Sequence, residues 1–114
     1  EFTVPAPFRA DLAIACDDVI DRKVQGVLMH RSQFYEWLPY DGHWQEVLEA
    51  KDDAEKTRRL QARLKRDFAL TVKRYRSAFP EDCSFGEVYQ IDEYGAKMTD
   101  EIRSAMHAQT RRQE

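Results

Sequence analysis

Residues 52–79 read DDAEKTRRLQARLKRDFALTVKRYRSAF, and this stretch predicts the dominant element of the fold. Asp52 and Glu55 have the spacing of a capping box, and Pro80 would end a helix after Phe79. We expect one helix between these limits, which is ~40 Å long at ~1.5 Å per residue. Its apolar side chains return every three or four residues, as in an α-helix with one buried face: Leu60, Leu64, Phe68, Val72, Tyr75 and Phe79.

The chain before this stretch predicts a strand and then another helix. Asp17 and Asp18 would cap a helix that continues to Leu38, where Pro39 would stop it. The preceding sequence ADLAIAC, residues 10–16, alternates as a short strand does. One side of that strand carries Leu12, Ile14 and Cys16.

The remaining predicted elements are shorter. The sequence HWQEVLEA, residues 43–50, predicts a short helix, and EVYQIDEY, residues 87–94, predicts a second strand. Thr99 is placed to cap a weak final helix, so residues 97–114 form that helix or a flexible tail. The order is β-α-α-α-β-α, and the fold class is mainly α with two short β-strands.

The bulk composition predicts one cytoplasmic domain. The chain has 114 residues, of which 42% are hydrophobic and 34% charged, as in a globular protein and unlike a disordered tail. No apolar run approaches the ~20 residues of a membrane span, and the N-terminal sequence lacks the pattern of a signal peptide. Cys16 and Cys83 stand apart from any ligand cluster, so we expect reduced thiols; a disulfide between them is the weaker alternative.

Charge is distributed unevenly along the chain. Residues 54–79 carry nine basic and two acidic groups, while the segments on either side are acidic. The basic helix could lie against the acidic segments of its own chain, or it could bind an anionic partner. The first interpretation requires no ligand, and we favour it.

A polar stripe follows one side of the helix predicted before Pro39. At ~100° per residue, these side chains fall together beside the apolar face: Lys23, His30, Gln33 and Trp37. The stripe could line a polar cavity, or it could pack against another element through side-chain hydrogen bonds. Ser32 cannot pair with His30 as nucleophile and base, because residues two apart on a helix do not face each other. The histidines and cysteines have no usual zinc-ligand spacing, so we assign no catalytic residue and no metal ligand.

The sequence DDVIDRKVQGVLMHRSQFYEWLPY, residues 17–40, resembles the C-terminal region of PIG-L/LmbE-type N-acetylglucosaminyl deacetylases. The resemblance includes a run like Tyr35–Pro39 and a late strand similar to GEVYQIDEYG, and it covers about residues 5–96. The matching positions are an acidic strand end, a lysine and a His-x-Ser-Gln-Phe signature, namely Asp17, Asp18, Lys23, His30, Ser32, Gln33 and Phe34.

The resemblance implies the C-terminal piece of a Rossmann-like α/β parent that hydrolyses an N-acyl amino sugar or a similar amide with zinc. The family's zinc ligands and base are implied to lie in His-Pro-Asp-Asp and His-Pro-Asp-His type motifs, and neither occurs in this sequence. Residues 1–96 would then form a fragment without its own cofactor, inactive alone. Lys23, His30, Gln33 and Trp37 would support the substrate site of the parent.

The same interpretation predicts the partners of this chain. We expect the N-terminal part of the parent enzyme and self-association, with neither nucleic acid nor membrane as a partner. Self-association would cover strand edges and apolar side chains, those of Leu12, Ile14, Val88 and Ile91. The alternative function is a helical interaction module that binds an acidic protein or nucleic acid through its basic helix 54–79.

Overall fold

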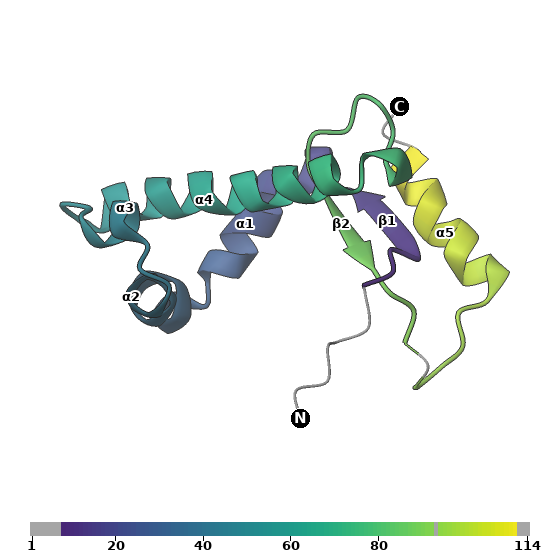
Figure 1. Cartoon of the computed structure of the whole chain (residues 1–114), viewed down its shortest axis with the longest axis horizontal. Coiled ribbons are helices and arrows are strands. Elements are labelled where there is room, and N and C mark those ends of the chain that lie inside the picture. The colour runs from purple at the N-terminus through teal and green to yellow at the C-terminus, as the bar shows by residue number, and fades with distance from the viewer. Residues whose placement is uncertain (1–7, 93, 112–114) are drawn as a thin grey trace. The chain divides into compact units, whose positions relative to one another are not determined.

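The computed structural model describes residues 8–92 and 94–111, with side chains described up to Met106. The described chain is mainly helical and has a two-stranded antiparallel sheet, so the predicted mainly α class is confirmed (Figure 1). It divides into two compact units, one of Glu1–Asp17 with Thr71–Glu114 and the other of Asp18–Leu70.

The first unit is built on the sheet. Strand β1 (Leu12–Ala15) pairs with β2 (Gly86–Tyr89), with Leu12 opposite Tyr89 and Ala15 opposite Gly86. Both strands are shorter than the predicted ranges 10–16 and 87–94. Glycine is required at position 86 because the Phe79 ring packs closely against its backbone. A Cβ at this position would lie 2.3 Å from that ring.

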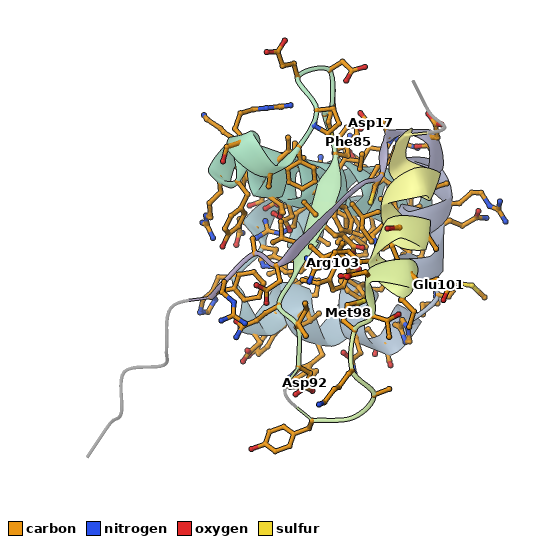
Figure 2. The ribbon with its side chains drawn as sticks, turned by 90° about the vertical axis from the view of Figure 1, so that its right-hand side faces the viewer. Asp17, Phe85, Asp92, Met98, Glu101 and Arg103 are labelled. Carbon is orange, nitrogen blue, oxygen red and sulfur yellow. The ribbon has the colours of Figure 1, made fainter. Side chains whose placement is uncertain are left out.

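A small apolar cluster forms the core of this unit. Val72, Phe79 and Cys83 are buried in it. Three strand residues and one aromatic residue pack against them, namely Ala13, its cross-strand partner Val88, Ala15 and Tyr75. Helix α5 (Asp100–Arg111) packs against β1, and Figure 2 shows this helix next to the strand. The predicted cap of this helix is confirmed, because Thr99 Oγ1 accepts the N–H of Ile102 at 3.2 Å.

The predicted capping role of Asp17 is wrong. Asp17–Val19 form a 3-10 turn (η1), and Val19 precedes α1 (Ile20–Leu28) without a side-chain cap. The Asp17 carboxylate instead accepts the N–H of Ser84 at 2.9 Å and that of Phe85 at 3.4 Å (Figure 2). The Asp17 carboxylate, which the sequence predicted to cap a helix, therefore accepts hydrogen bonds from the segment that leads into β2.

The second unit contains the first helix, which is interrupted. Helix α1 ends at Leu28 and a turn at Met29 follows, before the chain forms a π-helix, η2 (Ser32–Trp37). It returns to α geometry in α2 (Leu38–Asp41), so both the continuous helix to Leu38 and the stop at Pro39 are wrong predictions. Pro39 lies in the first turn of α2, where a residue without an N–H is tolerated.

A short helix and the part of a long helix up to Leu70 complete the unit. Helix α3 (Gln45–Leu48) lies inside the predicted range 43–50. Helix α4 (Asp53–Arg74) ends before the predicted limit, because Tyr75 has φ −114° and ψ 39° and a 3-10 turn, η3 (Arg76–Ala78), follows. The predicted apolar seam is otherwise correct: Leu60, Leu64, Val72 and Phe79 are buried and Phe68 and Tyr75 are half-buried.

The predicted capping box at the start of α4 is present with one change. Asp52 Oδ1 accepts the N–H of Glu55 at 2.8 Å, as expected for the cap residue. The Glu55 carboxylate reaches the N–H of Lys51 at 2.7 Å, one residue before the usual partner. The hydrogen bond from the Lys51 N–H is the largest cause that lowers the pKa of Glu55, and the Arg59 guanidinium lowers it further.

Cys16 and Cys83 are both buried, and no disulfide joins them, as predicted. Burial, and then the nearby Asp17 carboxylate, raise the pKa of Cys83 to about 12. Among residues 8–92 and 94–111, no helix combines the length and apolar character required to cross a membrane.

Candidate functional site

The π-helix η2 is the most unusual backbone feature of the second unit. Its wider turn is seen in the N–H of Leu38, which donates to the carbonyl of Gln33, five residues earlier. At its start, the His30 carbonyl accepts the N–H groups of both Gln33 and Phe34 at 3.1 Å. Short π segments in helices are rare and are frequently found at functional sites. η2 is therefore the first candidate for a functional site in this chain.

A cluster of side chains holds η2 against the first turns of α4; we call it the clasp and define it as Arg31, Tyr35, Asp53, Lys56 and Thr57. Thr57 Oγ1 donates to the Asp53 carbonyl at 2.9 Å, so its single proton is used and Tyr35 Oη donates to Thr57 Oγ1. Lys56 Nζ donates to the Tyr35 carbonyl at 3.1 Å. The clasp thus fixes both the ring and the backbone of Tyr35, which is buried.

Arg31 completes the clasp. Its guanidinium carbon lies 4.2 Å from the centroid of the Tyr35 ring, and its Nη2 pairs with the Asp53 carboxylate. A cation over an aromatic face contributes about 0.5–1 kcal/mol at an exposed site. The ring contact and the ion pair together account for the position of this arginine beside the buried Tyr35 side chain.

The four residues of the predicted polar stripe do not lie on one continuous helix face. Lys23 is on α1, where its Nζ lies 5.2 Å from the centroid of the Phe68 ring. His30 and Gln33 are exposed, and Trp37 is 60% exposed at the end of η2. The angular step of ~100° per residue fails between Met29 and Leu38, because the helix breaks and then widens into a π turn.

Two of the polar hollows among the described residues lie elsewhere, and none of the four residues lines either of them. The hollow in the second unit has a volume of about 270 Å³ and is lined by Asp21, Val24, Gln25, Gln61 and Lys65. Its ion pair joins Lys65 Nζ to Asp21 Oδ1 at 2.5 Å. Asp21 and Gln25 are four apart on α1 and so share a face, a signal that was readable in the sequence and was missed.

The hollow in the first unit has a volume of about 430 Å³ and lies where the chain enters β1 and leaves β2. Its lining residues are Arg9, Gln90, Ile91 and Asp92. Asp11 orders this end, because its carboxylate accepts from Arg9 Nε at 2.6 Å and from the Ile91 N–H at 2.8 Å. These two partners, with Arg9 as the larger cause, lower the pKa of Asp11.

Within the second unit, basic side chains of α4 contact Glu46, which precedes the helix, and Glu55, which lies in its first turn. Arg63 Nη1 lies 2.6 Å from Glu46 Oε1, and the Arg63 guanidinium carbon lies 4.0 Å from the centroid of the Trp44 ring. The hydrogen bond from Arg63 is the largest cause that lowers the pKa of Glu46. Arg59 donates to the Glu46 carbonyl and pairs with Glu55 at 2.8 Å. Part of the positive charge of α4 is therefore neutralised within the chain.

The zinc implied by the resemblance does not fit the described residues. No group of three or more His, Cys, Asp or Glu side chains in the described part of the chain could hold a metal ion. We therefore derive no metal-dependent step for this chain. No protein-family model matches the chain, and neither a curated protein nor a solved structure matches it.

Proposed function

We propose that this chain is the C-terminal region of a PIG-L/LmbE-type zinc-dependent N-deacetylase, in which it supports the site that binds an N-acyl amino sugar or a similar amide. The observation that carries the proposal is the position of the π-helix. η2 begins within the His-x-Ser-Gln-Phe signature, His30 to Phe34, and extends through the Tyr35–Trp37 part of the following run. The π-helical backbone therefore overlaps in sequence with the residues that resemble the deacetylase family.

The clasp gives this support a physical basis. A substrate site requires side chains held close to one geometry, and Lys56, Thr57 and Asp53 fix η2 from a capped helix. His30 and Gln33 are exposed on that fixed backbone, with Trp37 at its end. In this proposal His30, Gln33, Trp37 and Lys23 support substrate and neither bind metal nor transfer a proton.

The hydrolytic chemistry would come from residues outside this sequence. In the proposed parent, a Rossmann-like α/β domain would carry the zinc ligands, and the metal would supply polarisation of the amide carbonyl and activation of water. The residues of this chain contribute the wall behind the substrate. The chain alone is then expected to be inactive.

The test uses the enzyme that contains this region, with zinc analysis and deacetylation kinetics. His30→Asn is expected to raise KM for the N-acyl substrate while the zinc content stays close to one per site. His43→Asn is the matched control, since His43 is also exposed and asparagine tolerates its φ of 53°. Loss of zinc in His30→Asn would show that the histidine is a ligand. An unchanged KM, or an enzyme with no zinc-dependent amidase activity, would refute the proposed role.

The alternative function is a module that binds an acidic protein or nucleic acid through the basic helix 54–79. The ion pairs of Arg63 with Glu46 and of Lys65 with Asp21 reduce the charge available for such a partner. We therefore propose that the helix does not bind nucleic acid. A salt titration with duplex DNA distinguishes the functions, because binding through phosphates weakens steeply as salt rises. Submicromolar, salt-sensitive binding would favour the module.

A further inference from the structure

Pro39 is the residue that makes an α-helical path through η2 unfavourable. In an α-helix the N–H of residue 39 would donate to the Tyr35 carbonyl, and proline has no N–H. The proline ring would also clash with that carbonyl, which belongs to the residue four positions earlier. Pro39 is fully buried, and its own carbonyl accepts the N–H of Trp44 at 2.8 Å. Its position is therefore fixed, and the preceding backbone has to adjust.

The observed π turn resolves this conflict. The Leu38 N–H bonds to Gln33 in place of Phe34, which widens the turn in front of the proline ring. Pro39 has no N–H to donate to the Tyr35 carbonyl. This carbonyl instead accepts a hydrogen bond from Lys56 Nζ at 3.1 Å. A carbonyl in a half-buried position requires a donor to avoid an unfavourable desolvation.

We propose that Ser32–Trp37 can form either of two hydrogen-bond registers, the α register to the carbonyl four residues earlier or the π register to the carbonyl five residues earlier. Pro39 and Lys56 together select the π register. Lys56 is a positioning residue that supplies the hydrogen bond missing from residue 39. If the segment changed to the α register, the side chains after it would turn by about one residue, or ~100°. Trp37 and Tyr40, which are 60% and 75% exposed, would then face a different direction. The inference concerns the backbone and does not depend on the proposed deacetylase function.

The register is measured directly by NMR couplings across hydrogen bonds in the full chain. Wild type is expected to show coupling from the Leu38 N–H to the Gln33 carbonyl. In Pro39→Ala, that coupling should move to the Phe34 carbonyl, and a new coupling should join the N–H of residue 39 to the Tyr35 carbonyl. A Pro39→Ala protein that keeps the Leu38–Gln33 coupling would overturn the role of proline.

Lys56 is tested by amide exchange in a mutant cycle. With Pro39 present, Lys56→Met should lower the protection of residues 33–38 about fivefold, the effect of one hydrogen bond. In the Pro39→Ala background, the same change should have less than half of that effect. Lys56→Arg retains a donor and should preserve most of the protection, whereas Lys51→Met, at an exposed lysine before α4, should change little. Equal effects of Lys56→Met in both backgrounds would overturn the inference. If Pro39→Ala does not fold, a Lys56→Arg protein as poorly protected as Lys56→Met would overturn it equally.

Discussion

The Asp17 carboxylate accepts the backbone N–H of Ser84 at 2.9 Å, across 67 residues of sequence. The same carboxylate accepts the Phe85 N–H at 3.4 Å. It therefore connects the residue two positions after β1 with the turn that enters β2. In a two-stranded sheet, which is only marginally stable without other contacts, this connection helps to fix which residues face each other.

Asp17→Asn is expected to destabilise the first unit by about 1.5 kcal/mol, because a charge-assisted hydrogen bond is replaced by a neutral one. The expected local sign is faster amide exchange at Ser84 and Phe85. Asp18→Asn is the control, since it removes the same charge from the neighbouring exposed residue. Equal effects of the two changes would indicate that net charge, and not the Asp17 contact, is responsible.

The stability of the first unit is expected to fall in alkaline solution because of Cys83. Its pKa is about 12 in the folded protein, above the ordinary value of 9.0, so folding favours the neutral thiol. This contribution is fully present below about pH 9 and is lost as pH rises toward the folded-state pKa. Urea unfolding followed between pH 8 and pH 11 measures the loss. Cys83→Ala should flatten that part of the profile.

The cap of α4 is expected to contribute about 1 kcal/mol through Asp52, which accepts the Glu55 N–H at 2.8 Å. Asp52→Ala should lower the unfolding free energy by that amount, as measured by urea denaturation. Asp52→Ser retains an acceptor and should recover most of it. A serine variant as unstable as the alanine variant would show that the hydrogen bond is not the cause.

Leu60 is fully buried in α4, and Leu60→Ala is expected to destabilise the protein by about 2–5 kcal/mol through lost burial and the remaining cavity. Leu70 is the matched control on the same helix, because it is 51% exposed. Leu70→Ala should change stability by roughly 0.5 kcal/mol. Thermal unfolding of both variants gives the comparison, and similar losses would contradict the assigned seam.

The elements predicted correctly from sequence are those that local patterns determine. The seam from Leu60 to Phe79 repeats at helical spacing, and Thr99 and Asp52 are capping residues within three positions of their partners. The alternation around Leu12 likewise identified a strand. Each of these signals is contained in a few consecutive residues.

The features that were missed depend on residues distant in sequence. The π register of η2 involves Lys56, which is 21 residues after the carbonyl it contacts. Pro39 led to the prediction of a helix end, because proline disfavours α geometry in the residues before it. The sequence around Pro39 does not show that Lys56, from another helix, donates to the Tyr35 carbonyl. The predicted polar stripe was wrong for the same reason. A constant angle of ~100° per residue places Lys23 and Trp37 on one helix face, but the π turn between them changes that angle.

The burial of both thiols has a practical consequence for spectroscopy. Cys16 is 3% exposed and Cys83 is 6% exposed, so neither is readily available to a maleimide or nitroxide reagent in the folded protein. A single cysteine introduced at exposed Ser32 or at Tyr40 would then be labelled selectively without removal of the native thiols. Spin labels at those two positions would report directly on the orientation of the chain on either side of Pro39.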